Sequence, residues 1–308
     1  MKKMFLFFSF IFTLSLFTKA QTLNFENLNS MNLSRAAISS AADSNFIYVS
    51  NGYSTTTGFT TEIEKYDINK NQWSVFTKSL VAKNFSSSVI TGGNLYLFNG
   101  NSLGGKPNNK MEVVNLNTGE VTFSTDNPFP TKGGGAAVWN GIIYVFGGSY
   151  KNEVGDLSYS DKLYSFNPTT KEWTRLENMP KRIETKGEII NGELYVIGGY
   201  NGGQCKRIDK YDISTGKWSK VYTMPAGVSG HATAVYGSKI YIIGDYNTLT
   251  HAACYDVNTN TYTEIQPTNM VGRRHAAAAV VKGKLYIMGG NQTAAMNSSL
   301  SGLQVATY

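Results

Sequence analysis

The sequence predicts an all-β fold, a six-bladed β-propeller with four antiparallel strands in each blade. Three observations predict it: an apolar segment that recurs six times, a nearly constant spacing between its copies, and aromatic residues at fixed positions behind each copy. Repeats of roughly 40 to 50 residues built from short strands are typical of propellers. The six copies of the apolar segment occupy residues 46–52, 94–100, 142–148, 193–199, 239–245 and 284–290.

The tyrosine at the centre of each copy sets the period of the repeat. Successive tyrosines lie 48, 48, 51, 46 and 45 residues apart. The nearly continuous runs of Ile, Leu, Tyr and Val predict strands that are buried on both faces, between neighbouring blades. Each copy is therefore the second strand of one blade. The tyrosines are Tyr48, Tyr96, Tyr144, Tyr195, Tyr241 and Tyr286.

A glycine pair ends most copies, and glycine permits a left-handed backbone at such a position. Asn51 and Asn99 replace the first glycine in the first two blades, and Asp245 replaces the second glycine in the fifth. Because Asn tolerates the left-handed region, we expect Asn51 and Asn99 to adopt it.

Two further strands follow each copy. An aromatic residue next to an acid or amide, such as Tyr66-Asp67, is followed by a polar turn and then by an aromatic such as Trp73. Asp and Asn favour such turns. A segment of small residues precedes each copy and predicts the inner strand, because small side chains suit the crowded axis. Examples of this inner segment are residues 36–38, 135–138 and 276–281.

The end of the chain predicts how the ring closes. The sixth copy is followed by Leu303 to Tyr308, which fits a third strand and leaves no outer strand behind it. Residues 22–28 resemble the outer-strand sequence of residues 173–179. We therefore expect the N-terminal strand to supply the last strand of blade six.

Residues 1–20 are predicted to be a signal peptide, and residues 21–308 a single propeller domain. Lys2 and Lys3 precede an apolar run at residues 4–17, and Ala20 fits a cleavage site. This run is too short to span a bilayer comfortably. We expect a secreted or periplasmic protein that is monomeric and has no membrane contact after cleavage.

Composition excludes several classes of protein. The 308 residues are 41% hydrophobic and 16% charged, with 31 Gly, which excludes a disordered chain, a collagen and a coiled coil. Removing residues 1–20 lowers the net charge from +7 to +4, and no basic run suggests a nucleic-acid partner. Three histidines offer little material for a metal centre, so no metal and no cofactor are expected. Spacing alone leaves open whether Cys205 and Cys254 pair.

The glycine pair, the tyrosine some six residues before a tryptophan, and the tryptophan itself resemble the marks of the kelch-repeat family. The resemblance covers residues 22 to 308, and blade two departs most, with Val114 and Val121 in place of Tyr and Trp. It implies that ligands bind on the face formed by the loop before each inner strand and the loop after each glycine pair.

The loops before the inner strands and the loops after the glycine pairs each carry a recurring type of residue. Five of the six positions before the inner strands are basic and the sixth is Ser229, while tyrosines follow the glycine pair in four blades. Arginine grips a carboxylate with two parallel hydrogen bonds, and tyrosine offers a stacking face and a hydroxyl. This suits an acidic sugar or a carboxylate-bearing peptide. The alternative is that the basic residues tie neighbouring loops together and the tyrosines cap the core. The candidate ligand-binding residues are Arg35, Lys83, Lys132, Arg182, Arg274, Tyr53, Tyr150, Tyr200 and Tyr246.

We therefore expect an exported binding module for a glycan or protein ligand, with no catalytic residue. An alternative comes from residues 224–231, which resemble a segment of the sialate mutarotase group of secreted or periplasmic six-bladed kelch proteins. That resemblance implies a sugar isomerase in which Arg182 supplies a cation and Glu184 a carboxylate for proton transfer. The other interpretation of Glu184 is a surface ion pair with Lys181 or Lys186.

Overall fold

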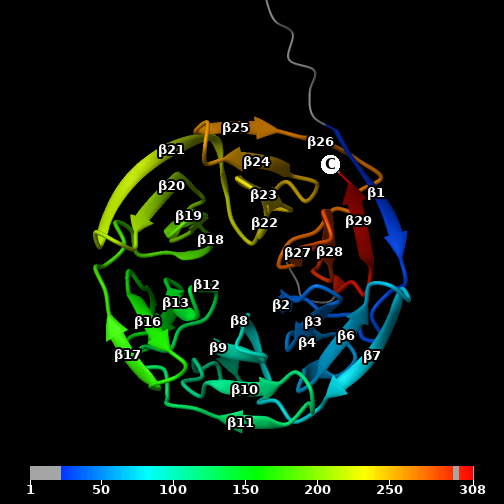
Figure 1. Cartoon of the computed structure of the whole chain (residues 1–308), viewed down its shortest axis with the longest axis horizontal. Coiled ribbons are helices and arrows are strands. Elements are labelled where there is room, and N and C mark those ends of the chain that lie inside the picture. The colour runs from blue at the N-terminus through cyan, green and yellow to red at the C-terminus, as the bar shows by residue number, and fades with distance from the viewer. Residues whose placement is uncertain (1–21, 294–297, 308) are drawn as a thin grey trace, which may run out of the picture.

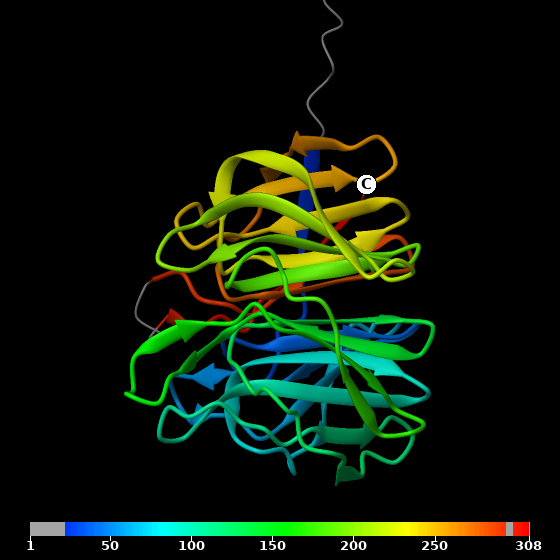
Figure 2. The same ribbon diagram turned by 90° about the vertical axis from the view of Figure 1, so that its left-hand side faces the viewer.

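Six antiparallel sheets surround a central axis and form the predicted six-bladed propeller (Figure 1). The computed structural model describes residues 22–293 and 298–307, and every element assigned there is a strand. The predicted signal peptide, residues 1–20, lies outside the described residues. In Figure 2 the propeller axis is horizontal and the inner strands run along it, so the connecting loops gather on the two faces of the ring.

The first three blades are four-stranded sheets whose strands follow the chain from the axis outward. Blade one contains β2 (Ser39–Ala42), β3 (Phe46–Ser50), β6 (Ile63–Asp67) and β7 (Gln72–Thr77). Blade two contains β8 (Lys83–Thr91), β9 (Asn94–Ser102), β10 (Glu112–Asn115) and β11 (Val121–Phe123). Blade three contains β12 (Gly135–Trp139), β13 (Ile142–Phe146), β16 (Leu163–Asn167) and β17 (Glu172–Arg175).

Blades four and five repeat this order, and two short ribbons lie in the loops after the glycine pairs. Blade four contains β18 (Glu184–Ile190), β19 (Glu193–Tyr200), β20 (Cys205–Asp212) and β21 (Lys217–Val228). Blade five contains β22 (Ala232–Tyr236), β23 (Lys239–Ile243), β24 (Ala252–Asp256) and β25 (Thr261–Glu264). The ribbons are β4 (Tyr53–Ser54) with β5 (Gly58–Phe59), and β14 (Ser149–Lys151) with β15 (Leu157–Tyr159).

Blade six closes the ring as predicted. It contains β27 (Ala277–Val281), β28 (Lys284–Met288), β29 (Leu303–Thr307) and, as its outer strand, β1 (Thr22–Leu28). β1 pairs antiparallel with β29, and it also pairs in parallel with β26 (Gln266–Thr268), which arrives from blade five. The first and last described strands, β1 and β29, therefore lie side by side in one sheet (Figure 1).

One predicted inner strand begins later than expected. Residues 36–38 precede β2, which starts at Ser39, and Ala37 has a φ of +53°, outside the strand region. Blades three and six agree closely with the prediction, since β12 and β27 begin at Gly135 and Ala277.

The repeated aromatic residues form cross-strand pairs between the third and fourth strands. Tyr66 lies opposite Trp73 in the sheet register, and their ring centroids are 5.0 Å apart. Asp67 has the predicted turn role, because its Oδ1 accepts hydrogen bonds from the amides of Asn69 and Lys70. The corresponding pairs in blades three and four are Phe166 with Trp173 and Tyr211 with Trp218.

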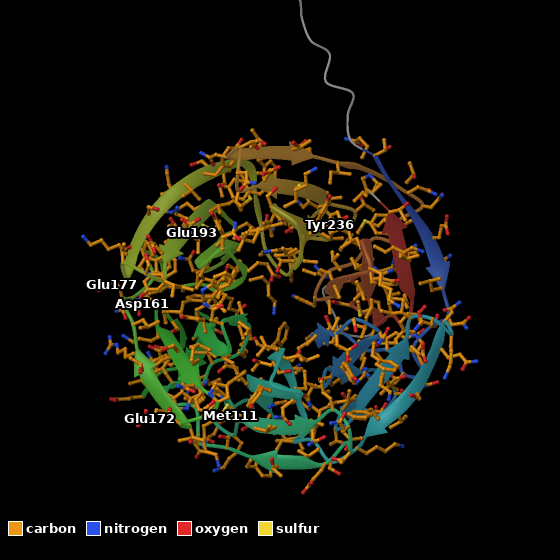
Figure 3. All side chains as sticks on the ribbon, viewed as in Figure 1. Met111, Asp161, Glu172, Glu177, Glu193 and Tyr236 are labelled. Carbon is orange, nitrogen blue, oxygen red and sulfur yellow. The ribbon has the colours of Figure 1, made fainter. Side chains whose placement is uncertain are left out.

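The core consists of apolar clusters between neighbouring blades. One cluster joins Tyr144 and Phe146 of blade three to Leu194 and Val196 of blade four. Charged side chains such as Glu172 and Glu177 lie along the outer edge of the ring, whereas Met111 is buried within it (Figure 3). The axis is left free for a channel and for the loops that surround its mouths.

Candidate functional site

Three basic side chains in the loops that lead into the inner strands are buried. Arg35 Nη2 lies 3.0 Å from Glu64 Oε1, and Lys83 Nζ lies 2.5 Å from Glu112 Oε2. Neither ion pair is exposed to solvent. Arg273 has the same place in blade six, where its Nη2 donates to Gln304 Oε1 at 3.0 Å. These cations join each inner loop to the third strand of the same blade.

This finding corrects the expectation that Arg35 and Lys83 face a ligand. The basic residues predicted in blades three and six, Lys132 and Arg274, stand one position later in the repeat. The bridge of Lys132 with Ser149 and that of Arg274 with Asn291 correspond to the bridge of Ala36, not Arg35, with Tyr53. Because side chains alternate between faces in extended chain, a shift of one residue moves a side chain from the mouth to the interior.

Arg182 stands one position before the buried residue of its blade. Its side chain is 73% exposed, and its Nε lies 3.4 Å from Asp161 Oδ2. It does not line the cavity described below. A cation beside Glu184 is instead supplied by Lys132.

Backbone hydrogen bonds between blades surround the mouth of the channel. The amide of Phe85 donates to the carbonyl of Ala37 at 2.8 Å, and the amide of Gly133 donates to the carbonyl of Phe85 at 3.0 Å. Each bond runs from one blade to the preceding blade. The other links are Ala37 to His275, Thr185 to Gly133 and His275 to Gly230. We call these residues the mouth ring: Ala37, Phe85, Gly133, Thr185, Gly230 and His275.

A cavity of about 340 Å³ opens at the mouth ring, and all six blades contribute to its lining. We call this cavity the cup. Its walls combine aromatic rings, imidazoles, hydroxyls and charged groups. Of the residues predicted from the sequence, Lys132, Glu184, Tyr200 and Tyr246 line the cup.

Lys132 and Glu184 form an ion pair on one wall. Lys132 Nζ lies 3.5 Å from Glu184 Oε1, and Ser149 Oγ donates to the same oxygen at 2.5 Å. Lys132 Nζ also lies 5.4 Å from the ring centroid of Phe85, within the range of a cation–π interaction. Both side chains of the ion pair remain partly exposed to the cup. Glu184 is therefore charge-balanced and accessible, and its ion-pair partner is Lys132, not Lys181 or Lys186 as the second interpretation expected.

Tyr246 forms another wall of the cup, and Arg274 packs against its ring. The guanidinium carbon of Arg274 lies 4.1 Å from the ring centroid of Tyr246, and Arg274 Nη1 donates to the Tyr246 carbonyl at 2.9 Å. The imidazole of His275 packs against Tyr246 and against Phe85. Arg274 therefore positions an aromatic wall of the cup, and its own side chain is buried.

Tyr53 and Tyr150 stand in the two ribbons and do not line the cup. Tyr53 packs against Phe59 of its own ribbon, with ring centroids 5.6 Å apart. Tyr150 packs against Phe129 at 5.1 Å. Both tyrosines therefore pack within loops at the rim.

Lys186 and His231 were not singled out as ligand-binding residues, yet both line the cup. They occupy the same position of the repeat in blades four and five, where the other blades carry Ile38, Ser86, Gly134 and Ala276. Comparing this position along the repeat would have identified them as the two exceptions with a long polar or ring side chain.

His231 is 2% exposed, and its imidazole lies close to the backbone of Ile197. Burial lowers the pKa of His231 to about 3, and the carboxylate of Asp245 opposes that shift. Burial also lowers the pKa of Lys186, while Glu188 and Glu184 act in the opposite direction. The imidazole is therefore neutral at pH 7.

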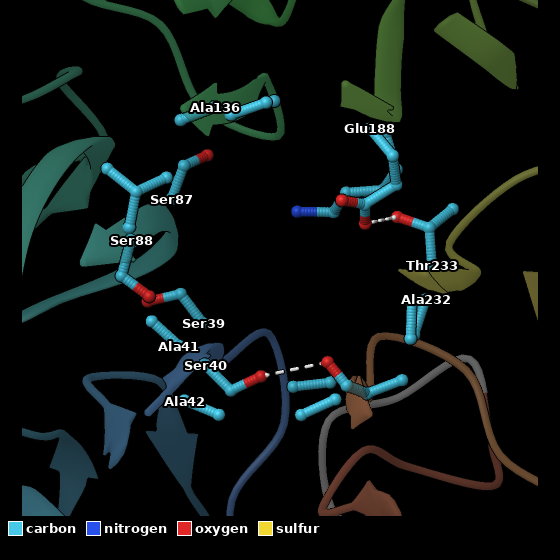
Figure 4. Close-up of a pocket in the computed structure, with 18 of the residues that line it drawn as sticks. Ser39, Ser40, Ala41, Ala42, Ser87, Ser88, Ala136, Glu188, Ala232 and Thr233 are labelled. Carbon is cyan, nitrogen blue, oxygen red and sulfur yellow. Dashed lines mark hydrogen bonds between the residues drawn. The ribbon is translucent and has the colours of Figure 1, made fainter. Parts of the chain in front are cut away.

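A channel of about 330 Å³ continues below the cup along the axis, lined by the inner strands. As predicted, most of its side chains are small, such as Ser40, Ala41 and Ala136 (Figure 4). Lys186 and Glu188 are charged exceptions, and Glu188 Oε1 accepts a hydrogen bond from Thr233 Oγ1 at 2.7 Å. Burial raises the pKa of Glu188 to about 7.

Cys205 and Cys254 are both buried free thiols. Residues 22–293 and 298–307 contain no group of three or more His, Cys, Asp or Glu that could hold a metal ion. Within the same ranges, no helix has the length and apolarity needed to cross a membrane.

The cup is equipped to bind a ligand of the size of one ring. Aromatic faces pair with apolar ring faces, and the mixed donors and acceptors fix orientation, as in small-molecule sites generally. An accessible carboxylate beside an ammonium and a neutral imidazole also permits proton transfer.

Comparison with known proteins agrees with this architecture. A family model described as Attractin/LZTR1 beta-propeller matches residues 95–304. The chain is 29% identical over 162 residues to Kelch-like protein 36 of Bos taurus, covering 50% of this chain and 26% of that protein. It is 27% identical over 160 residues to Kelch-like protein 23 of Homo sapiens, covering 50% and 27%. It is 25% identical over 238 residues to Spermatocyte protein spe-26 of Caenorhabditis elegans, covering 74% and 41%.

The matches thus span between a quarter and two-fifths of the length of these relatives. The family match covers more than half of the chain, and the six sheets carry the repeat that defines kelch propellers. The chain belongs to the Attractin/LZTR1 β-propeller family and is a kelch-repeat β-propeller.

Proposed function

We propose that this protein is a binding module whose cup holds one polar, ring-sized unit of a glycan or protein ligand. The observation that carries the proposal is the cup itself, about 340 Å³ in volume and lined by all six blades. Specific small-ligand sites typically have volumes of about 300 to 1,000 Å³ and combine apolar walls with a few polar groups.

Two features of the cup support a sugar unit as the preferred occupant. Tyr246 is held in place by Arg274 and presents a ring to the cavity, and tyrosine rings pack well against apolar sugar faces. Glu184 and Ser229 offer hydrogen-bond acceptors for hydroxyl groups. A protein ligand would instead insert one side chain into the cup and contact the ribbons at the rim.

The test is a thermal-shift and calorimetric screen of residues 21–308 against neutral sugars, uronic acids and short acidic peptides. A ligand that binds only the folded protein raises the melting temperature by mass action. The expected result is saturable binding to at least one sugar that Tyr246→Ala weakens. If no sugar or peptide shifts the melting temperature of the wild-type protein, the proposal fails.

A second candidate function is a sugar mutarotase, favoured by the accessible carboxylate of Glu184. Anomer exchange needs a proton acceptor and a donor near the ring oxygen. Glu184 with Lys132 and Ser149 supplies such groups, whereas Arg182 does not reach the cup. The test is polarimetry or NMR of anomer exchange, in which Glu184→Gln removes any acceleration while ligand binding remains.

Export remains part of the proposal, supported by Lys2, Lys3 and the apolar run at residues 4–17. Expression of the full chain with detection in the periplasm or medium tests it. N-terminal sequencing of the mature protein is expected to begin at Gln21.

A further inference from the structure

The axial channel below the cup contains two charged side chains, and both come from blade four. The described residues that line the channel are otherwise small, hydroxylic or aliphatic, and only Lys186 and Glu188 carry a charge. Lys186 also lines the cup, whereas Glu188 does not. Because the inner strands run from the mouth ring towards the far face, Lys186 lies at the neck between the cup and the channel, and Glu188 lies deeper.

Comparison along the repeat shows that Glu188 stands where the other blades carry small or apolar residues. It lies opposite Tyr195, the central tyrosine of blade four, in the register of β18 with β19. A register shift in this pairing lies directly before Lys186. A buried charge is costly, and irregular pairing of this kind often occurs beside functional sites. The residues opposite the central tyrosine in the other five blades are Ala41, Val89, Ala137, Ala234 and Ala279.

Both charged side chains face the junction between blades four and five. Lys186 and Glu188 are two residues apart in β18, so they point to the same face of the strand. They lie opposite Ile197 and Tyr195, which belong to the apolar cluster between these blades. In the part of the chain that the structure describes, no carboxylate oxygen lies within 4.0 Å of Lys186 Nζ. Lys186 and Glu188 therefore interact electrostatically without forming an ion pair.

The rest of the channel is electrically neutral. Hydroxyl-bearing side chains of blades one and two lie across the opening from Glu188, as Figure 4 shows for Ser40 and Ser88. Beyond Glu188 the lining becomes aliphatic. From the cup downwards, the channel thus offers a cation, an anion and an apolar end. The aliphatic residues at that end are Ile90, Val138, Ile189, Val235 and Val280.

This order of charges fits a zwitterion better than an ion of one sign. An anion beside Lys186 would be repelled by Glu188, and a cation beside Glu188 would be repelled by Lys186. Burial lowers the pKa of Lys186 and raises the pKa of Glu188, so the surroundings do not fully compensate either charge. A molecule that carries both a carboxylate and an ammonium supplies a counter-charge to each side chain.

We propose that the axial channel binds a free aliphatic α-amino acid. The carboxylate of the amino acid accepts a hydrogen bond from Lys186 at the neck, and its ammonium donates to Glu188. Its side chain extends into the aliphatic end of the channel. The volume of about 330 Å³ is sufficient for such a molecule. The site lies below the aromatic walls of the cup, and the inference does not rest on the proposed function.

The experiment measures binding of four probes by isothermal titration calorimetry. L-valine is compared with isovalerate, which lacks the ammonium, with isobutylamine, which lacks the carboxylate, and with glycine, which lacks the side chain. The wild-type protein is expected to bind valine at least about tenfold more tightly than either single-charge probe, the order of one lost charge-assisted hydrogen bond. Glycine is also expected to bind about tenfold more weakly, because it leaves the aliphatic end unfilled.

Two variants test which side chain recognises which charge. Lys186→Met is expected to reduce the preference for valine over isobutylamine to within about twofold and to keep the preference over isovalerate. Glu188→Gln keeps an acceptor for the Thr233 hydroxyl and removes the charge. It is expected to show the reverse pattern, with valine and isovalerate binding within about twofold of each other.

Matched controls separate recognition in the channel from effects on folding. Lys220→Met and Glu172→Gln make the same substitutions at exposed positions of the outer strands β21 and β17. Both controls are expected to keep all the preferences of the wild-type protein. The comparison of the four probes on the wild-type protein needs no variant, so it tests the proposal even if a channel variant fails to fold.

Each remaining outcome decides the matter. Binding of isovalerate or isobutylamine as tight as that of valine overturns the zwitterion site. Preferences that survive unchanged in both channel variants overturn the assignment of Lys186 and Glu188. Absence of valine binding to the wild-type protein overturns the inference and leaves the proposed function of the cup standing, because sugars and peptides test that function separately.

Discussion

Lys83 Nζ and Glu112 Oε2 lie 2.5 Å apart, and neither side chain is exposed to solvent. The ion pair joins the loop before β8 to β10 of the same blade. Glu112 also accepts a hydrogen bond from the amide of Val81 at 2.6 Å, so the carboxylate fixes the loop from two sides. The lysine that looked like a ligand contact in the sequence is a structural element of blade two.

Breaking this pair is expected to destabilise the propeller strongly. Lys83→Met leaves the carboxylate of Glu112 buried without its cation, which is expected to lower the free energy of unfolding by about 3 to 5 kcal/mol. Adding Glu112→Gln removes the unpaired buried charge and keeps an acceptor for the Val81 amide, so the double variant should recover most of the lost stability. Urea denaturation measures the free energy of unfolding of the single and the double variant. A double variant no more stable than Lys83→Met would contradict this account.

The closing strand is expected to contribute to stability through its buried side chains. Phe25 of β1 is buried in the cluster shared by blades five and six and lies opposite Ala306. Phe25→Ala is expected to lower the free energy of unfolding by about 3 to 5 kcal/mol. The matched control Phe123→Ala, on the exposed end of β11, should change it by no more than about 0.5 kcal/mol. Similar losses in both variants would refute closure by β1.

His231 is expected to make the protein less stable in acid. Its pKa is about 3 in the folded protein because of burial, against an ordinary value of 6.5. Between pH 6.5 and 3 the imidazole is protonated in the unfolded chain but stays neutral in the folded protein. The free energy of unfolding therefore decreases as the pH falls through this range, by up to about 1.4 kcal/mol per pH unit. His275, with a pKa lowered to about 4, adds to this trend. Unfolding measured from pH 7 to 4.5 should show a shallower decline in His231→Phe, and an identical decline would count against this assignment.

Arg274 and Tyr246 are expected to act as one unit in ligand binding. Arg274→Met removes the group stacked on the Tyr246 ring and the hydrogen bond to its carbonyl, so the aromatic wall loses its support. Tyr246→Ala should weaken sugar binding by about tenfold, the order expected for one lost aromatic contact. Arg274→Met should weaken it less, and the double variant no more than Tyr246→Ala alone. Tyr150→Ala, outside the cup, is the control, and additive losses would contradict coupling.

The two cysteines are expected to remain unreactive in the folded protein. Cys205 packs between blades three and four and Cys254 between blades five and six, so they belong to separate clusters. Burial raises the pKa of the Cys254 thiol to about 11, which suppresses the reactive thiolate. Iodoacetamide at pH 8 should label neither thiol in the native protein and both in urea, as read by mass spectrometry. Unlabelled cysteines in urea without reductant would reveal a disulfide.

The fold could be predicted in detail from the sequence because the same strand pattern occurs six times along the chain. The spacing of Tyr48, Tyr96 and their counterparts gave the blade number, and the likeness of residues 22–28 to residues 173–179 gave the closing strand. Asn51 and Asn99 do adopt positive φ, as expected for their place in the glycine pair. These features depend on short-range pattern, which a linear sequence preserves.

The candidate site was only partly predictable. Lys132, Tyr200, Tyr246 and Glu184 line the cup, whereas Arg35, Lys83 and Arg182 do not. Each loop contains several polar residues in succession, and a difference of one position decides whether a side chain faces the mouth, the interior or the outer surface.

The sequence by itself determined the class, the number of blades and the strand that closes the ring, because these follow from periodicity. Only the tertiary structure decided which side chains share the cup. Lys186 and His231 are 45 residues apart and come from different blades, yet they meet because six loops converge on one axis. The register shift in blade four is likewise a property of pairing between strands and not of any one segment.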